Sequence, residues 1–149
     1  MEETDQKNQI SETTYRVEDQ IGFLLRKAHQ RASALFQSQF SEYQTTPTQF
    51  STLCKLKDEG EISQNHLGRL TAMDPATIQG VTRRLIDRGL VQTRPDDKDR
   101  RRMLLRLTDE GQGVIDSLIL KGKSVTKKTL SPLSQEEQLK LIELLNKIS

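Results

Sequence analysis

Residues 74–107 read DPATIQGVTRRLIDRGLVQTRPDDKDRRRMLLRL, and the architecture of the whole chain follows from them. The leading Asp-Pro pair is typical of a helix start, and Gly89 is placed to end a helix over residues 75–88. Residues 90–92 and 103–107 are apolar runs that predict two strands, and the polar, turn-rich segment between them predicts a hairpin. With a short helix ahead of it, this unit makes a helix-turn-helix followed by a wing.

The rest of the chain has the pattern of helices. Apolar residues recur at three- and four-residue steps from about Tyr15 to Tyr43, which predicts one long helix. Further helix starts are marked by capping side chains at Thr46, Ser63, Thr108 and Ser134. The resulting order is mainly α (α+β): a winged helix-turn-helix with N- and C-terminal dimerisation helices.

This order divides the chain into four parts. We expect a disordered or frayed N-terminus over residues 1–14, a dimerisation helix over 15–45, a winged helix-turn-helix DNA-binding domain over 46–108, and C-terminal dimerisation helices over 109–149. The first helix would be about 43 Å long, beyond the roughly 30 Å width of a small domain, so its own chain cannot cover it. The last helix carries apolar groups on several faces, and a homodimer is the commonest solution to both. In such a dimer the helices over residues 75–88, one from each subunit, would lie about 34 Å apart. If they contact double-stranded DNA, this spacing predicts a pseudo-palindromic operator.

The composition excludes several classes of protein. The 149 residues are 33% hydrophobic and 30% charged, with no apolar run of the roughly 20 residues that cross a membrane. The acidic start is unlike a secretory signal, and the single Cys54 leaves no disulfide framework, so we expect a soluble, cytoplasmic protein without a membrane partner. The only two histidines lie far apart, and catalytic, phosphate-binding and metal-binding motifs are absent. We therefore expect no enzyme, no cofactor and no metal site.

Positive charge gathers around the predicted hairpin. Residues 83–106 hold nine arginines or lysines against four aspartates, whereas the net charge of the whole chain is +2. This density indicates a contact with a polyanion, although a solvated charged face is an equal alternative on composition alone.

The helix over residues 75–88 has two distinct faces. One side, which must face the core, carries Ile78, Val81, Thr82 and Leu85. The other side carries the residues expected to bind DNA, which are Ala76, Thr77, Gln79, Arg83 and Arg84. Small side chains let the backbone approach a major groove, glutamine reads an adenine edge, and arginine takes guanine or phosphate. A purely structural surface helix more often carries Glu-Lys pairs here, which favours groove reading.

The predicted hairpin tip supplies a second contact. Lys98, Arg100 and Arg101 lie in this loop, where basic side chains suit a narrow minor groove. We expect Asp99 at a buried edge, where it fixes one guanidinium and so orients the wing. A simple solvated turn is the weaker alternative.

Together, these motifs resemble the MarR family of winged helix-turn-helix transcription regulators, over residues 17–149. The resemblance is carried by TPTQF (46–50), LGRL (67–70), DPAT (74–77), LIDRGLV (85–91) and the run from DRR (99–101) to LTDEG (107–111). It implies a triangular homodimer paired through the first, fifth and sixth helices. It also implies that the helix over 75–88 enters a major groove, that Arg101 probes the adjacent minor groove, and that Asp99 holds an arginine.

The first helix is similar, over residues 18–30, to family members that respond to aromatic carboxylates such as hydroxycinnamates and hydroxynicotinates. This similarity implies an effector cleft between the dimer helices and the winged domain. Arg26 and His29 lie three apart on one helix face, so one carboxylate can meet both, while Phe50 supplies a wall and His66 a second polar contact. A surface ion pair for Arg26 and a hydrogen-bonded interface histidine for His29 are equal alternatives.

These patterns predict a ligand-responsive repressor of an aromatic-acid catabolic or related operon. A small aromatic carboxylate would release it from the operator by favouring a dimer whose reading helices are wrongly spaced. Two alternatives stay open: a winged-helix module that binds protein, and a redox-sensing repressor that uses Cys54. The favoured interpretation of Cys54 is a buried, inert thiol.

Overall fold

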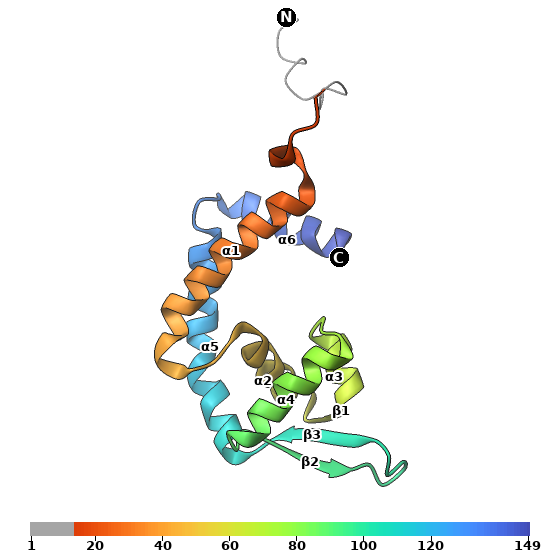
Figure 1. Cartoon of the computed structure of the whole chain (residues 1–149). Coiled ribbons are helices and arrows are strands. Elements are labelled where there is room, and N and C mark those ends of the chain that lie inside the picture. The colour runs from red at the N-terminus through yellow and green to blue at the C-terminus, as the bar shows by residue number, and fades with distance from the viewer. Residues whose placement is uncertain (1–13) are drawn as a thin grey trace, which may run out of the picture.

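The computed structural model describes residues 14–149, and Figure 1 shows its arrangement. In chain order the elements are η1 (Val17–Asp19), α1 (Ile21–Phe40), η2 (Ser41–Tyr43), α2 (Pro47–Glu59), β1 (Glu61–Ser63), α3 (Gln64–Leu70), α4 (Pro75–Asp87), β2 (Val91–Pro95), β3 (Met103–Leu107), α5 (Asp109–Leu130) and α6 (Gln135–Ile148), where η marks a short 3₁₀ helix. Helices α1 and α5 lie side by side, with α6 near one end and α2–α4 and the sheet at the other. The predicted frayed start lies, apart from Thr14, outside the described residues.

The five predicted helix caps are all present. Thr46 forms a full capping box, because its side chain accepts from the Gln49 N–H at 3.2 Å and the Gln49 side chain returns to the Thr46 N–H. The same kind of side-chain cap starts α3, α4, α5 and α6, at Ser63, Asp74, Thr108 and Ser134. These caps satisfy N–H groups that have no partner inside their own helix.

The prediction of one helix from Tyr15 to Tyr43 is wrong at both ends. Gln20 has an extended backbone that separates η1 from α1, and Gln44, with φ 50°, closes η2 in the left-handed region. Helix α1 therefore has 20 residues, about 30 Å rather than 43 Å. The described residues before α1 are exposed, so no tertiary packing stabilises them as part of the helix. An apolar periodicity does not stabilise a helix unless its apolar face is packed.

A three-stranded antiparallel sheet completes the winged helix-turn-helix, and this mainly α fold class is confirmed. The strand order is β1-β3-β2, and the predicted hairpin pairs Val91 with Leu107 at one end and Pro95 with Met103 at the other. The hairpin's first strand runs further than predicted, because the residues up to Pro95 pair with β3. Pro95 is tolerated at the last position of the strand, where its missing N–H costs little. Strand β1 was not predicted, since three residues around Ile62 form a strand only by pairing with the distant β3.

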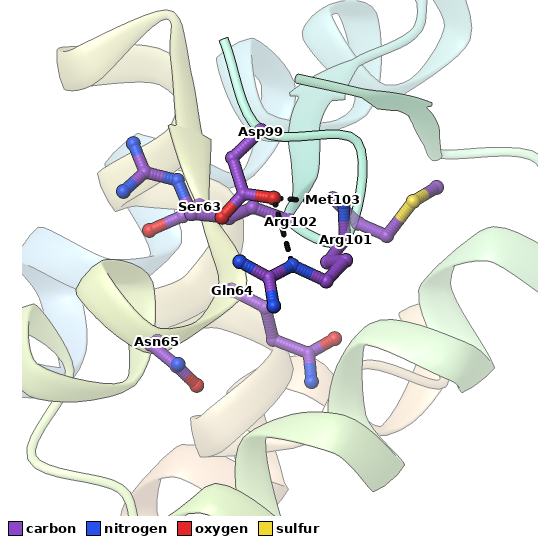
Figure 2. Close-up of a pocket in the computed structure, with 7 residues that line it drawn as sticks. All are labelled: Ser63, Gln64, Asn65, Asp99, Arg101, Arg102 and Met103. Atoms are coloured by element: carbon purple, nitrogen blue, oxygen red, sulfur yellow. Dashed lines mark hydrogen bonds and ion pairs between the residues drawn. The ribbon is translucent and has the colours of Figure 1, made fainter. Parts of the chain in front are cut away.

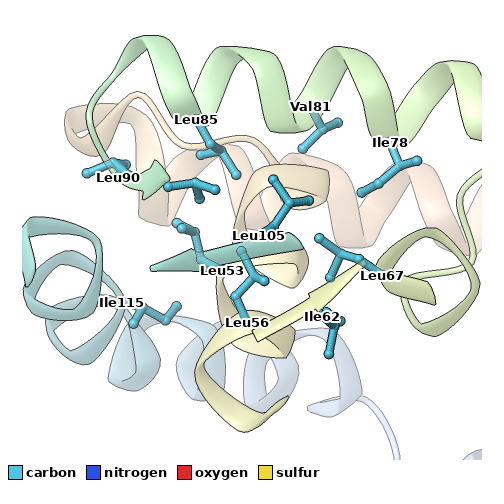
Figure 3. Packing of buried hydrophobic residues seen from close by; sticks show 11 residues of the cluster. Leu53, Leu56, Ile62, Leu67, Ile78, Val81, Leu85, Leu90, Leu105 and Ile115 are labelled. Carbon is cyan, nitrogen blue, oxygen red and sulfur yellow. The ribbon is translucent and has the colours of Figure 1, made fainter. Parts of the chain in front are cut away.

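The face of α4 predicted to be buried lies on the core (Figure 3). Ile78 is 1% exposed and Leu85 is fully buried, and both belong to a cluster with residues of α2, α3, β3 and α5. Thr82 is buried beside them and donates its hydroxyl proton to the Ile78 carbonyl at 2.9 Å. A second cluster, between α1 and α5, contains Phe36, Phe40, Leu118 and Val125.

The turn after α4 is fixed to the start of α5. The backbone N–H of Thr108 donates to the Leu90 carbonyl at 3.0 Å, and the Thr108 hydroxyl donates to the Gly89 carbonyl at 2.6 Å. One turn into α5, Gly111 approaches so closely that a Cβ there would lie 2.0 Å from the Leu90 oxygen. Only glycine permits this close approach, which joins the end of α4 to the long helix α5.

Two helix surfaces expose apolar side chains. Helix α6 has no buried residue, and its exposed apolar side chains are Leu139, Leu141, Ile142, Leu144, Leu145 and Ile148. The first turns of α1 expose Ile21, Leu24 and Leu25 in the same way. Within residues 14–149, no helix has the length and apolarity to cross a membrane.

Candidate nucleic-acid interface and ligand cavity

The outward face of α4 presents all five predicted DNA-binding side chains to solvent. Ala76, Thr77, Gln79, Arg83 and Arg84 are each exposed, on the side opposite the buried residues of the helix. They therefore form one surface, with the small residues near the N-terminus and the arginines one to two turns later. Their common orientation is what insertion into a groove requires.

The cap of α4 restricts what Thr77 can do. Asp74 accepts from the Thr77 N–H and from the Thr77 hydroxyl, both at 2.8 Å, and these bonds lower the pKa of Asp74. Because its hydroxyl proton is already donated, Thr77 meets a base edge mainly as an acceptor. An amino group of adenine or cytosine is the donor that matches it.

The close approach of α3 to α4 fixes how these two helices pack against each other. A Cβ at Gly68 would lie 3.1 Å from Ile78 Cγ2 and 3.2 Å from the Met73 carbonyl, so glycine allows the two helices to touch. Ala72, with φ 54°, makes the turn between them in a backbone region that favours glycine.

The buried acid of the wing is Asp96. It is 7% exposed, accepts from the Lys98 N–H at 3.0 Å and faces Arg102 Nε at 3.2 Å. The Lys98 N–H first, and then the positive charge of Arg102, hold the pKa of Asp96 below its ordinary value. The Asp96 N–H in turn donates to the Arg102 carbonyl at 2.8 Å, which closes the base of the loop.

The prediction of Asp99 at a buried edge is therefore wrong in part, since its side chain is 47% exposed. Asp96 follows directly after β2, where the chain leaves the sheet, whereas Asp99 lies in the turn itself. Asp99 does hold an arginine: its carboxylate accepts from the Arg101 N–H at 3.1 Å and from Arg101 Nε at 3.2 Å. The Arg101 side chain is nevertheless 92% exposed, and Lys98 and Arg100 are exposed as well.

A groove joins the wing to the start of α3 (Figure 2). It has a volume of about 510 Å³ and is lined by Ser63, Gln64, Asn65, Asp99, Arg101, Arg102 and Met103. The Arg101 guanidinium points from the wing towards Gln64 across this groove. The sequence did not single out Gln64 or Asn65, although the cap at Ser63 is a local signal that places them in the first turn of α3.

An ion pair across the sheet braces the wing. Arg94 on β2 donates through Nε to Glu61 Oε2 at 3.0 Å and through Nη2 to Oε1 at 2.6 Å. Because β3 lies between β2 and the strand of Glu61, this two-pronged contact spans the whole sheet. It raises the pKa of Arg94 further, chiefly through the hydrogen bonds to Glu61.

The four residues predicted to bind an effector do not line one cavity within the described chain. Arg26 is exposed over the Phe23 ring, 5.6 Å from its centroid, and His29 Nε2 lies 3.3 Å from the Ser33 hydroxyl, both on α1. His66 is half-buried on α3, and Phe50 projects from α2 towards Gly122 of α5. The spacing of Arg26 and His29 is a local property, whereas their distance from the other two depends on the packing of α1.

Phe50 does line a cavity of about 490 Å³ between α2 and α5. Its other lining residues are Cys54, Ile119, Gly122, Lys123, Thr126, Lys127, Leu130 and Gln138. Gly122 makes room for the ring, because a Cβ there would lie 2.5 Å from the Phe50 Cζ atom. Lys123 and Lys127, which no sequence motif indicated, are four residues apart and so share one helix face. The cavity thus combines an aromatic wall with two positive charges.

Cys54 is half-buried in this cavity rather than fully buried as expected. Burial, with a smaller contribution from the nearby Asp58 charge, raises the pKa of the thiol. A raised pKa lowers the fraction of reactive thiolate. Among residues 14–149, no cluster of three or more His, Cys, Asp or Glu side chains has the geometry to hold a metal ion.

Several known proteins resemble this chain in sequence and in fold. The MarR family model matches residues 45–103. The HTH-type transcriptional repressor NicR of Pseudomonas putida is 41% identical over 139 residues, which cover 93% of this chain and 88% of the repressor. The structure of Bordetella bronchiseptica BpsR, whose DNA binding is regulated by 6-hydroxynicotinic acid, has a TM-score of 0.87 at 35% identity and covers 91% of this chain and 96% of BpsR.

A third relative is known in complex with DNA. A mutant of Escherichia coli MarR, complexed with operator DNA, has a TM-score of 0.79 at 25% identity, over 85% of this chain and 91% of MarR. NicR is thus a transcriptional repressor, BpsR has regulated DNA binding, and the MarR mutant binds operator DNA. The resemblance read from the sequence motifs is confirmed, and the chain belongs to the MarR family of transcription regulators.

Proposed function

We propose that the protein is a homodimeric repressor that binds a pseudo-palindromic operator and leaves it when a small aromatic carboxylate binds. The observation that carries the DNA-binding half is the two-sided character of α4. One side is fully packed in the core, and the other exposes five side chains suited to base and phosphate contacts. A major groove about 12 Å wide admits such a helix.

The exposed side chains of α4 divide the proposed contacts with DNA between them. Ala76 allows the backbone to approach the bases, Gln79 reads an adenine edge, and Arg83 and Arg84 take guanine or phosphate. Lys98, Arg100 and Arg101 extend the contact into the neighbouring minor groove, where arginine gains from the concentrated negative potential. Asp99 orients Arg101 for this contact through its two hydrogen bonds.

The groove between the wing and α3 fits the sugar-phosphate backbone that separates the major groove of DNA from the minor groove. Gln64 and Asn65 offer amide donors there, beside the Arg101 guanidinium. Such contacts fix the register of a protein on DNA without reading its sequence. They complete a continuous surface from α4 to the wing.

The exposed apolar faces of α1 and α6 support the homodimer. Both faces would leave large apolar side chains in water, and a second copy of the chain covers them by two-fold symmetry. The dimerisation helices over residues 15–45 and 109–149 then hold two winged domains, residues 46–108, about 34 Å apart. A repressor of this kind acts in the cytoplasm, where the DNA is.

The cavity between α2 and α5 supports an aromatic carboxylate as effector. The Phe50 ring matches an aromatic ring, and Lys123 and Lys127 match a carboxylate. The regulation of BpsR by 6-hydroxynicotinic acid, an aromatic carboxylate, favours the same chemistry here. Arg26, His29 and His66 stay predictions, which a ligand-bound structure of the dimer tests.

Two alternatives are weaker. A protein-binding winged module does not need the exposed arginines of α4 and the wing, and it would show no duplex affinity even at low salt. A redox repressor needs a reactive thiolate, whereas burial raises the pKa of the Cys54 thiol. Operator release that persists in Cys54→Ser excludes this second mechanism.

The decisive experiment compares the salt dependence of duplex binding in Arg101→Ala and in Lys128→Ala. Each dimer loses two phosphate-neutralising charges in Arg101→Ala, so the slope of log K against log salt should fall by about 2, at roughly 0.9 per contact. Lys128 is an exposed cation at the far end of α5, and its loss should leave the slope unchanged. Equal slopes in both variants and the wild type contradict the wing contact.

The effector is tested with 6-hydroxynicotinate. We expect it to raise the melting temperature and to release a bound duplex, and we expect the double variant Lys123→Gln, Lys127→Gln to lose both responses. If the double variant responds like the wild type, the α2–α5 cavity is not the effector site.

A further inference from the structure

The C-terminal end of α4 is held by a single arginine to the elbow between α1 and α2. Arg88 Nη1 donates to Gln49 Oε1 at 3.0 Å and to the Gln44 carbonyl at 3.3 Å, and Nη2 donates to the Tyr43 carbonyl at 3.5 Å. Gln49 Oε1 also accepts from the Thr46 N–H at 3.4 Å, within the capping box of α2. A change in the backbone of the elbow therefore reaches α4 through Arg88.

This elbow contains a cavity of about 520 Å³, within the range of small-molecule sites. It is lined by Ser33, Phe36, Gln37, Phe40, Ser41, Gln44, Thr45, Thr46 and Pro47. Two of these are aromatic, and the rings of Phe36 and Phe40 stack with centroids 4.0 Å apart and planes 5° apart. None of the lining residues is charged, and the remainder are hydroxyls, amides and one proline.

The elbow cavity is separate from the proposed effector cavity and from the proposed dimer surface. It shares no lining residue with the cavity around Phe50. It also lies at the end of α1 away from α6 (Figure 1). Neither the aromatic carboxylate nor the second copy of the chain therefore accounts for it.

We propose that the elbow cavity is a second ligand site, which takes a neutral, planar aromatic molecule and signals its occupancy to α4 through Arg88. The aromatic lining favours a flat ring, and the hydroxyl and amide groups favour a ligand that both donates and accepts hydrogen bonds. An anionic ligand is disfavoured, because a carboxylate placed there loses water without gaining a positive partner.

Two residues that line the elbow cavity connect it to Arg88. Gln44 and Thr46 line the cavity, and both belong to the set of groups that Arg88 holds directly or through Gln49. A ligand that shifts this segment moves the acceptors of the guanidinium. The proposed effect of the ligand on DNA affinity rests on the proposed function, whereas the binding of the ligand in the elbow cavity does not.

Occupancy is tested with benzamide and benzoate, which share a shape and differ in charge. We expect benzamide to raise the melting temperature of the wild type and of Ser38→Trp, but not of Gln37→Trp, in which the indole fills the cavity. Gln37 lines the cavity, whereas Ser38 is its exposed neighbour and does not. Benzoate should change the melting temperatures of Gln37→Trp and Ser38→Trp by the same amount.

Ring signals of Phe36 and Phe40 in the unmodified protein, followed by NMR, give a measurement that needs no variant. Benzamide should shift them. Benzoate is no control in this measurement, because the Phe50 ring of the proposed effector cavity packs edge-on against both Phe36 and Phe40. A benzamide response that survives in Gln37→Trp, or unshifted ring signals, overturns the site.

The signal is tested by duplex affinity at saturating benzamide. We expect at least a threefold loss in the wild type and no change in Arg88→Leu, which still binds benzamide. The same loss in Arg88→Leu overturns the role of Arg88. A failure of the proposed function is distinguishable, because the wild type would then bind no duplex even without benzamide.

Discussion

Replacing Gly111 with alanine tests the joint between the reading helix and α5. The new methyl group would lie 2.0 Å from the Leu90 oxygen and 2.9 Å from the Leu90 carbonyl carbon, both of them backbone atoms that no rotamer change can remove. The joint must open, which also weakens the two hydrogen bonds that Thr108 donates to Leu90 and Gly89.

The expected loss can be worked from these contacts. Overpacking costs about 1–3 kcal/mol, two weakened hydrogen bonds cost about 0.5–1.5 kcal/mol each, and the better helix propensity of alanine returns about 1 kcal/mol. We expect Gly111→Ala to lower the free energy of unfolding by about 1–5 kcal/mol, a fall of ~0.5–2.5 M in the urea midpoint at a slope of about 2 kcal/mol per M.

Gly113→Ala is the matched control, two residues later in the same helix. A Cβ there meets nothing within 4 Å, so alanine should stabilise the protein by about 0.5–1 kcal/mol. Urea unfolding followed by circular dichroism, at one fixed protein concentration, measures both variants. A Gly111→Ala midpoint at or above that of the wild type refutes the proposed close approach.

Three further outcomes are expected. Ile142→Asp places a carboxylate on the exposed apolar face of α6, and sedimentation should show a monomer at micromolar concentration where the wild type is a dimer; a dimeric variant contradicts the assigned face. The pKa of Asp96 is lowered in the folded state, so its stabilisation of the wing is complete above the ordinary aspartate value of about 3.9 and is lost as the pH falls through the lowered value; amide exchange of the wing should accelerate there, and the acceleration should be absent in Asp96→Asn. Because burial raises the pKa of the Cys54 thiol, iodoacetamide at pH 8 should alkylate it more slowly than free cysteine, and an equal rate would restore the redox hypothesis.

The parts of the structure that the sequence predicted depend on neighbours in the chain. A cap such as Ser134 needs only the N–H groups of the next three residues, so its signal is complete within a few letters. The buried face of α4 is set by the helical period, and both it and the exposed face lie where that period predicts. For the same reason Gly89, which has a positive φ, ends its helix at the predicted point.

The parts that escaped prediction depend on contacts far along the chain. Strand β1 exists because Ile62 pairs with Leu105, and no local pattern in three residues indicates this. Asp96, rather than Asp99, is the buried acid because the sheet ends beside it, which only the strand register determines. The effector prediction joined residues of α1, α2 and α3 whose relative positions follow from helix packing, so the two lysines of α5 were missed.

Helix α4 is held at three places, and these contacts limit how the proposed effector could release DNA. Gly68 seats its first half on α3, Arg88 holds its C-terminal end to the elbow, and Leu90 locks the following turn to α5. A change in the position of α4 therefore requires a movement of α3, the elbow or α5, or the loss of one of the three contacts. A tenfold loss of operator affinity corresponds to about 1.4 kcal/mol. One hydrogen bond to a charged group contributes about 1.5–3 kcal/mol. A ligand that releases DNA by breaking one Arg88 hydrogen bond must offset this loss as well, so it must bind the released state more tightly by about 3–4 kcal/mol in total.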